Sequence, residues 1–354
     1  MKIAIDLTPL HGRKWTGVEL YAIDLYRSLL ELGYEVIPIF YESNDLDNNS
    51  SAFMIGKTKR LLLENYSLSK ALRTIKADIA LFPIFPPPID IYINRPSKIV
   101  PVIHDTAFIR YRSTLKYAAK YYLTPKYKIA LKASDYLVTI SETSKKQLSD
   151  YSKLRILNWG ENISVDFKKE NLQISDKHLN QFNLLPNQYY ISVSTIEPRK
   201  NLKYLLDIIQ DELIQNQKKL VLVGRKGWGN DIELQKKIEK LQEYIVFTDY
   251  VTLEELQSLY HYAYAFALMS LDEGFGRTPL EAIACGCKRI IVSDIDVFHE
   301  TMGNYVNYLP LDDTSFCKHQ FLQKQWKITD KDFPIPFNDM IKKIFLIGNS
   351  QNKL

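Results

Sequence analysis

Apolar and polar residues alternate along this chain in two successive series of short strands and amphipathic helices. In the first series, a helix is predicted over Glu19–Leu32, where apolar residues recur at helical spacing and Gly33 ends the pattern. The apolar runs predicted as strands are Lys2–Asp6, Tyr34–Phe40, Asp78–Phe82, Lys98–Ile103, Asp135–Ile140 and Leu154–Leu157. Strands that alternate with helices predict a mostly parallel, doubly wound α/β sheet.

A second series begins after a polar stretch, Asn158–Gln188, in which the periodicity fades. Its predicted strands are Tyr190–Ser194, Lys219–Val223, Tyr244–Phe247, Tyr264–Ser270 and Lys288–Val292. Its predicted helices are Leu202–Asp211, Asp231–Gln242, Leu253–Tyr262 and Pro279–Cys285. The pattern therefore predicts two doubly wound units, with the polar stretch as the crossover between them.

The stretch Leu268–Cys285 carries the clearest chemical signal. A predicted strand runs into the turn Asp272–Gly276, and Thr278 and Pro279 then open a helix. A strand, a glycine-rich turn and a helix together present backbone N–H groups and a positive helix end to a phosphate. Two carboxylates near such an anion site suit sugar hydroxyls, because a carboxylate accepts hydrogen bonds and a hydroxyl donates them. Glu273 and Glu281 therefore predict a nucleotide-sugar site.

Glu281 has a second interpretation. Thr278 and Glu281 have the spacing of a capping box, in which the glutamate reaches back to the helix start. That arrangement would make Glu281 a residue of stability alone. Glu273 lies on a loop with no evident local partner and is the stronger functional candidate.

The Glu273–Glu281 pattern, followed by AIACG, resembles the signature of the retaining glycosyltransferases of family four. Glu197–Asn201 (EPRKN), LVGRKGWG at 222–229 and DYVTLEELQSLYHYA at 249–263 resemble further segments of that family, in the same order. By this resemblance Glu273 contacts the donor sugar, Gly274, Phe275 and Gly276 approach sugar and phosphate, Glu281 holds the ribose, and Lys200 meets the diphosphate.

The resemblance implies the GT-B fold, with two Rossmann-like doubly wound domains facing a central cleft. The expected division is an acceptor-binding domain over 1–168, a linker over 169–187 and a nucleotide-sugar-binding domain over 188–330. Residues 331–354 are expected to form a helix that crosses back to the first domain. In the family, the loop with Gly17 faces the donor phosphates, and His104 matches a histidine close to the donor sugar. A turn glycine and a structural histidine are the alternatives for these two residues.

Glu197–Lys200 follows a predicted strand end, so its cations are expected beside the ligand. Arg199 can hold phosphate bidentately and Lys200 as a point charge. Many relatives carry a Gly-Arg pair a few residues upstream, where this chain has Ser194 and Thr195. Arg199 is one substitute for that arginine and Arg225 another, and a helix start with solvated cations is the alternative for both Arg199 and Lys200.

Transfer from a nucleotide sugar requires stabilisation of the departing diphosphate, which the cations and the helix N-terminus supply. The family implies retention of anomeric configuration without a clear protein nucleophile, so none is named. Asp294 and Asp296 resemble the Asp-x-Asp metal motif of another glycosyltransferase fold, but they follow a late strand. We expect metal-independent catalysis and no cofactor, with the nucleotide sugar as a substrate.

The charge pattern bears on partners. The net charge of +5 is too small to indicate nucleic acid. From Arg110 to Lys132, however, the chain has seven basic residues and five tyrosines and no acidic residue. This composition suits an anionic membrane surface, where rings lie at headgroup depth and cations meet lipid phosphate. The alternative is a solvated helix face whose tyrosines pack on the core.

The remaining composition fits a cytoplasmic protein, placed at the inner face of the cell membrane if the basic segment binds lipid. No apolar run reaches the length of about 18–20 residues that a membrane span requires. Asp6 interrupts the apolar start where a signal peptide would need its apolar centre. The chain has three cysteines, and Cys285 and Cys287 indicate packing rather than a metal site.

The favoured hypothesis is a glycosyltransferase that moves a hexose or deoxyhexose to a lipid-linked or oligosaccharide acceptor in surface polysaccharide synthesis. The EPRKN and KGWG segments resemble members that use GDP-mannose, with dTDP-rhamnose and UDP-hexoses as alternatives. A catalytically silent binding or scaffold subunit with a GT-B shell is a hypothesis of another class. A sugar-nucleotide epimerase and a phosphorylase remain as alternative enzymes.

Overall fold

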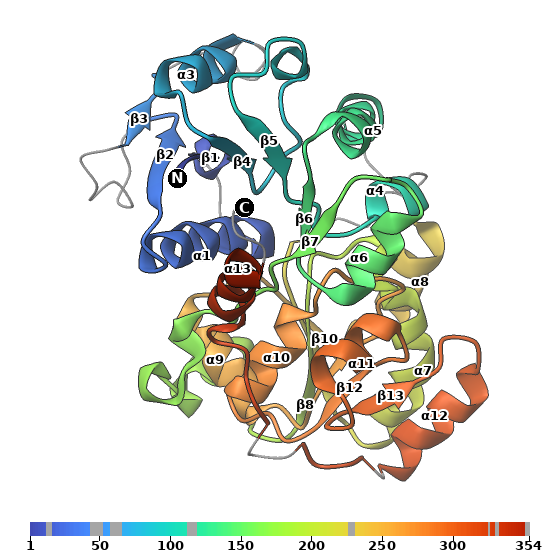
Figure 1. The fold of residues 1–354 in the computed structure, drawn as a ribbon. Helices are drawn as coiled ribbons and strands as arrows, with labels where there is room; N and C mark the ends of the chain where they lie inside the picture. Colours follow the sequence, from blue (N-terminus) through green and yellow to red (C-terminus); the bar gives the residue numbers. More distant parts are fainter. Residues whose placement is uncertain are drawn as a thin grey trace. The chain divides into compact units, whose positions relative to one another are not determined.

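The computed structural model describes residues 1–11, 16–42, 52–56, 66–111, 119–225, 231–324, 326–329 and 333–350. These residues divide into two compact units, Met1–Asn162 with Asn338–Leu354, and Ile163–Phe337. Each unit contains its own parallel sheet, as the alternating pattern predicts, and Figure 1 labels the elements. None of the helices in the described ranges has the length and apolar character needed to span a lipid bilayer.

The first unit contains a five-stranded parallel sheet in the order β3-β2-β1-β4-β5. A parallel pair, β6 and β7, continues from it through a bridge between Val102 and Val138. The strands are β1 (Lys2–Asp6), β2 (Glu35–Phe40), β3 (Phe53–Met54), β4 (Ile79–Phe82), β5 (Lys98–Pro101), β6 (Leu137–Thr139) and β7 (Ile156–Asn158). The helices are α1 (Gly17–Glu31), α3 (Leu68–Ile75), α4 (Ala107–Arg110), α5 (Thr124–Ala133), α6 (Glu142–Ser149) and α13 (Asp339–Ser350).

Helix α1 begins at Gly17, two residues before the predicted start at Glu19. The Glu19 carboxylate accepts a hydrogen bond of 2.9 Å from the backbone N–H of Thr16 and another from the Thr16 hydroxyl, so the first turn is tied back to the residue before it. Helix α6 begins in a related way, because the Ser141 side chain accepts from Ser144 N at 3.0 Å. Ser141 is therefore the N-cap of α6.

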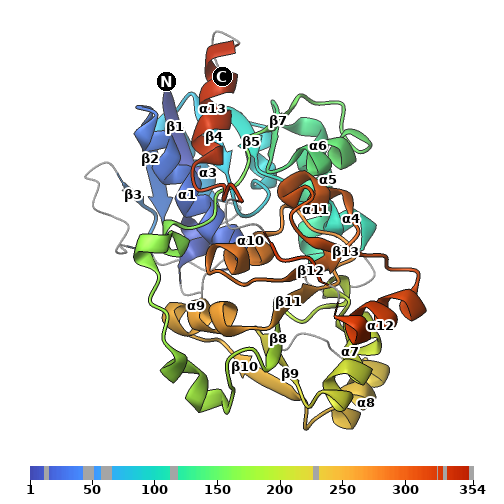
Figure 2. The same ribbon diagram turned by 90° about the horizontal axis from the view of Figure 1, so that it is seen from below.

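The second unit contains a six-stranded, all-parallel sheet in the order β10-β9-β8-β11-β12-β13, which Figure 2 shows from below. This order is that of a dinucleotide-binding Rossmann sheet, with a switch point between β8 and β11. The strands are β8 (Tyr189–Val193), β9 (Lys219–Val223), β10 (Ile245–Asp249), β11 (Ala265–Leu268), β12 (Ile290–Ser293) and β13 (Asn307–Leu309). The helices are α7 (Leu202–Gln215), α8 (Ile232–Lys240), α9 (Leu253–Tyr262), α10 (Arg277–Ala284), α11 (Asp296–Met302) and α12 (Thr314–Gln323).

Helices cover both faces of this sheet. Helix α7 packs against α8 and α12, and α9 packs against α10, so the helices form two groups that Figure 1 shows on opposite sides of the strands. Strands β8, β11 and β12 are almost wholly buried, as expected when both faces of a parallel sheet are covered. Their sequences are accordingly continuous apolar runs.

The two units differ from the expected domain boundaries. The first unit ends at Asn162 instead of 168, and the second extends from Ile163 to Phe337. The supposed linker 169–187 belongs to the second unit, where the 3₁₀ helix Asp176–Phe182 packs on α9 and Leu179 is buried. The segment 169–187 is polar because its short 3₁₀ turns bury few residues. These turns nevertheless pack on the second unit.

The end of the chain returns to the first unit. Helix α13 packs on α1, and the Asn162 side chain accepts a hydrogen bond of 2.9 Å from Met340 N, one of the amides of its first turn. Gly160 has φ +72°, and a Cβ there would lie 2.7 Å from a carboxylate oxygen of Asp339. The glycine thus lets α13 begin close to the 158–162 segment.

Candidate functional site

The loops after β8 and β11 form the candidate site of the second unit. These strands are neighbours in a parallel sheet, so their carboxyl ends meet at one edge, beside the switch point where doubly wound sheets bind ligands. The backbone N–H of Leu271 donates to the carbonyl of Arg199 at 2.9 Å, which ties the two loops together. Lys200 and Glu273, far apart in sequence, therefore lie side by side.

Glu273 is at the centre of this contact. Its carboxylate accepts from the Lys200 ammonium at 2.6 Å and from the Ser270 hydroxyl at 2.7 Å, and Arg199 Nη1 lies 3.4 Å away. Ser270 is itself held in place, because the Ser293 hydroxyl donates to its carbonyl at 2.6 Å. The Glu273 side chain is 9% exposed and that of Lys200 15%, so this is a largely buried ion pair.

Burial would raise the pKa of Glu273, but the charges of Lys200 and then Arg199, with the Lys200 and Ser270 hydrogen bonds, bring the pKa below its ordinary value. The carboxylate therefore stays ionised at neutral pH although it is removed from water. An ionised acceptor beside two cations suits a ligand that has both hydroxyls and negative charge.

Arg199 bridges several acceptors in this loop. Its Nη1 donates to the carbonyl of Asp272 at 2.8 Å, and its Nη2 to Glu197 at 3.0 Å. With 17% of its side chain exposed, it is not the solvated cation of the alternative interpretation. The same holds for Lys200.

The turn that follows Glu273 leads directly into α10. Gly276 is the N-cap, with φ +96°, and a Cβ there would lie 2.8 Å from the Phe298 ring. No other residue type fits that conformation and that space without strain. The N-cap residue of this helix has no side chain that could accept from the first amides. These are the amides that the sequence predicts to bind an anion.

Glu281 does not form the capping box. Helix α10 begins at Arg277, and the Glu281 carboxylate instead accepts from the Tyr260 hydroxyl at 3.2 Å and lies 3.7 Å from Arg277 Nε. Burial raises the pKa of Glu281, and Arg277 and Tyr260 offset part of that rise. Arg277 is a third buried cation of the site, and the spacing of four between Arg277 and Glu281 is the sequence signal that could have revealed it.

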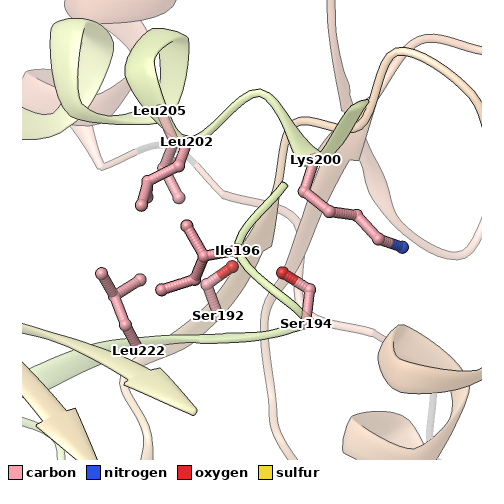
Figure 3. A pocket seen from close by; sticks show the side chains of 7 residues that line it. All are labelled: Ser192, Ser194, Ile196, Lys200, Leu202, Leu205 and Leu222. Carbon is pink, nitrogen blue, oxygen red and sulfur yellow. The ribbon is translucent and has the colours of Figure 1, made fainter. Parts of the chain in front are cut away.

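A small pocket lies beside Lys200, under the start of α7. Figure 3 shows the Ser192 and Ser194 hydroxyls beside a group of apolar side chains, with the Lys200 ammonium directed away from them. The apolar lining residues are Ile196, Leu202, Leu205 and Leu222.

The next loop of the sheet contacts the loop that carries Lys200. Gly224 has φ +132°, and a Cβ there would overlap the carbonyl oxygen of Ser194. Arg225 follows with an exposed side chain, and its carbonyl accepts from Ile196 N at 3.1 Å. The rest of the predicted LVGRKGWG segment, residues 226–229, lies outside the described residues.

The other candidates belong to the first unit. His104 follows β5, and its Nε2 lies 2.8 Å from the Pro83 carbonyl. The Asp105 side chain accepts from Ala107 N at 2.9 Å, at the start of α4. Gly17 is the first residue of α1, and the residues just before Thr16 lie outside the described ranges.

The basic segment combines exposed and packed side chains. Tyr121 is 55% exposed, whereas Tyr127 stacks on Phe108 with ring centroids 4.2 Å apart. Lys126 is buried, with its ammonium 5.0 Å from the Tyr122 ring centre, and is therefore not a surface cation. Residues 112–118 of this segment lie outside the described residues.

Within the described ranges, no group of three His, Cys, Asp or Glu side chains is arranged to hold a metal ion. Asp294 accepts from His299 Nε2 at 2.6 Å, and the His299 ring stacks on Tyr308. Cys285 and Cys287 are buried free thiols, and burial raises the pKa of both.

The second unit contains the part of the chain that resembles a known protein family. Residues 175–315 match the family model of glycosyl transferases group 1. O-antigen chain mannosyltransferase RfbU of Salmonella typhimurium is 29% identical over 191 residues, which cover 52% of this chain and 50% of that protein. The serotype-specific mannosyltransferase WbdA of Escherichia coli is 28% identical over 48% of this chain, but only 22% of that protein is covered. The chain thus spans half or less of the length of these two relatives.

A longer match is O-antigen chain mannosyltransferase B of Escherichia coli, 25% identical over 86% of this chain and 85% of that protein. Among solved structures, HepE of Anabaena in complex with UDP-glucose has a TM-score of 0.66 at 16% identity, covering 100% of this chain and 96% of that one. WaaG, a glycosyltransferase involved in lipopolysaccharide biosynthesis, has a TM-score of 0.66 at 14% identity, covering 99% and 96%. These likenesses show that the two Rossmann-like units are those of the GT-B fold.

The ionised state of Glu273 gives a pH prediction. Because its folded-state pKa is depressed, Glu273 stabilises the fold above the unfolded-state pKa of about 4.3, and this contribution is lost as pH falls through the folded-state value. Glu273→Gln should lower the free energy of unfolding at neutral pH by roughly 1–3 kcal/mol, since charged hydrogen bonds to two cations are lost. The melting temperatures of wild type and variant should converge as pH falls below about 4.3, as measured by thermal melts.

A matched control is Glu233→Gln, which removes a carboxylate with 71% of its side chain exposed, paired with Lys203 on the same unit. This change should leave the melting temperature nearly unaltered at every pH. A gap between wild type and Glu273→Gln that does not narrow at any pH below about 4.3 would mean that ionisation of Glu273 is not what stabilises the fold.

Proposed function

Because residues 175–315 match the family model of glycosyl transferases group 1, we propose that the protein transfers a sugar from a nucleotide donor to a glycan acceptor. The observation that carries the proposal is the buried Lys200–Glu273 pair at the start of the glycine turn and helix α10. It brings an ionised carboxylate, two cations and a helix N-terminus to one sheet edge. A nucleotide sugar has complementary groups, with hydroxyls on one side and a diphosphate on the other.

The proposed roles follow the chemistry of each side chain. Lys200 and Arg199 bind the diphosphate, whose charge grows as the glycosidic bond breaks, and the amides of α10 add to this stabilisation. Glu273 accepts hydrogen bonds from sugar hydroxyls. Lys200 pairs with Glu273 at 2.6 Å in this structure, so a bound diphosphate would share that ammonium with the carboxylate.

Further contacts extend this assignment. Glu281 binds the ribose hydroxyls, held in place by Tyr260 and Arg277, and the Gly274–Gly276 backbone approaches the sugar and phosphate. Arg225 is a second arginine available to the nucleotide, since it is exposed at the end of β9. In the first unit, His104 contacts the transferred sugar and Gly17 opens the helix that approaches the phosphates.

A GDP-mannose donor and a lipid-linked or oligosaccharide acceptor in surface polysaccharide synthesis are the finer form of the proposal. Three relatives with mannosyltransferase names support it, although the HepE structure contains UDP-glucose. A dTDP-rhamnose or UDP-hexose donor would use the same diphosphate contacts. The donor screen below therefore includes all three nucleotides.

The first test is a thermal-shift screen with GDP, UDP, dTDP and their sugar conjugates. A ligand that binds only the folded state raises the melting temperature by mass action, and at 100 times its Kd the gain is about 2.7 kcal/mol. We expect one nucleotide sugar to stabilise the wild type and Lys200→Ala to bind it at least tenfold more weakly. Lys203→Ala, which removes a cation with 41% of its side chain exposed three residues away, should bind like the wild type.

Stabilisation by a nucleotide sugar without transfer or hydrolysis would favour the silent binding subunit. Conversion of the donor to an isomeric nucleotide sugar without an acceptor would indicate an epimerase. The absence of any shift would contradict the proposed function itself.

We further propose that transfer retains the anomeric configuration, as the family resemblance implies. We also propose that it needs no metal ion, since the side chains of Lys200, Arg199 and Arg277 supply the positive charge. Activity should therefore persist in excess EDTA, within about twofold of the untreated enzyme. Proton NMR of the product should show the anomeric configuration of the donor. A reversible loss of activity in EDTA, or an inverted product, would contradict the respective part of this proposal.

Contact with an anionic membrane through Arg110–Lys132 is also proposed. The exposed Tyr121 and the basic residues of α5 support it, whereas the buried Lys126 cannot take part. The triple variant Lys120→Gln, Lys128→Gln, Lys132→Gln should bind vesicles that contain anionic lipid more weakly, with a loss of roughly 3 kcal/mol in binding free energy. A smaller fraction of the variant should therefore sediment with the vesicles. Variants of Lys236, Lys237 and Lys240 on α8 serve as a control for net charge. Equal sedimentation of the triple variant and the wild type would contradict this contact.

A further inference from the structure

Three contacts within the first unit hold His104. Its Nε2 donates to the Pro83 carbonyl at 2.8 Å, and since a carbonyl oxygen only accepts, Nε2 carries the proton. The Ser144 hydroxyl donates to the backbone carbonyl of His104 at 3.1 Å. The Tyr21 ring packs against the imidazole edge to face, with centroids 4.8 Å apart and planes at 84°. Rotation of the imidazole would lose the first and third contacts together.

Tyr21 acts through its ring. The residue is fully buried, and its hydroxyl has no hydrogen-bond partner among the described residues. Burial and then the nearby Glu161 raise the pKa of Tyr21, so the phenol remains neutral. A buried hydroxyl without a partner costs stability, so the hydroxyl is not what favours tyrosine here. The contact with His104 is made by the aromatic ring, which a phenylalanine would also supply.

The position of Tyr21 on α1 links the two candidates of this unit. Gly17 is the first residue of the 15-residue helix α1, and Tyr21 lies four positions later, on the same helix face. The His104 ring is therefore packed one turn from the N-terminal end of α1. Because the Thr16–Glu19 contacts fix that end, the imidazole and the helix start form one rigid arrangement.

We propose that Tyr21 is a positioning residue for the transfer reaction, orienting the His104 imidazole relative to the first turn of α1. The proposal rests on the proposed function, in which His104 contacts the transferred sugar. A loosened imidazole would be misplaced in the transition state, and a displacement of about 1 Å can cost about a hundredfold in rate. Binding of the nucleoside diphosphate by Lys200 and Glu281 would be unaffected.

The test compares Tyr21→Phe, which keeps the ring, with Tyr21→Leu, which removes it. Tyr21→Phe should keep kcat within about twofold of the wild type, while Tyr21→Leu should lower kcat by about tenfold or more and leave the Kd of the nucleoside diphosphate unchanged. Leu29→Ala, a buried change two turns further along α1, is the control for loss of stability alone. At an equal loss in melting temperature it should keep a nearly normal kcat.

A second measurement is independent of activity. Histidine-labelled protein has six imidazoles, and the resonance lost in His104→Gln identifies that of His104. In the wild type and Tyr21→Phe, ¹⁵N NMR should show a single tautomer protonated at Nε2. In Tyr21→Leu, a mixture of tautomers should appear.

A normal kcat in Tyr21→Leu, or an equal loss of kcat in Leu29→Ala, would overturn the positioning role. A single Nε2 tautomer in Tyr21→Leu would overturn it as well. A protein that binds no nucleotide sugar fails the proposed function instead, and the NMR result still decides whether Tyr21 orients His104.

Discussion

The ion pair between Lys200 and Glu273 is the interaction on which the arrangement of the candidate site depends. It joins loops from two neighbouring strands, 73 positions apart in sequence, within a largely buried setting. Buried charges are costly without partners, so the geometry of both loops must be maintained for each charge to remain satisfied. Ser270 donates to Glu273 from the same loop, and Ser293 holds Ser270 in place. Arg199 belongs to the other loop and would lose Glu273 as a partner if the loops separated.

The same edge of the sheet shows how one carboxylate differs from another. Glu273 is surrounded by two cations and stays ionised, whereas Glu281 is buried beside Tyr260 and Arg277 with its pKa raised. A carboxylate with a depressed pKa is a strong acceptor at neutral pH. A carboxylate with a raised pKa, such as Glu281, remains ionised only when Arg277 and the hydroxyls of its ligand stabilise its charge. The two glutamates of the signature are thus in different electrostatic environments, although their spacing suggests a symmetrical pair.

Much of the fold could be predicted from the sequence because apolar periodicity reports local burial. The strand Lys2–Asp6 and the helix Leu253–Tyr262 have the predicted limits, and most other predicted elements differ from the structure by a few residues. Elements with weak periodicity were missed, among them β13 and α12. The segment 169–187 appeared to be a linker because its short turns are polar, although Leu179 anchors them to the second unit.

The sequence by itself determined the two doubly wound sheets, the glycine turn and the identity of Glu273, Lys200 and Arg199 as candidates. Strand patterns and signature motifs depend on residues that are close together in the sequence, so they can be recognised without the structure. Only the tertiary structure decided which charges meet. It paired Lys200 with Glu273, turned Glu281 toward Tyr260 and Arg277, buried Lys126 and packed Tyr21 on His104. These contacts join residues from different elements, and their partners depend on how strands and helices pack, which periodicity does not specify.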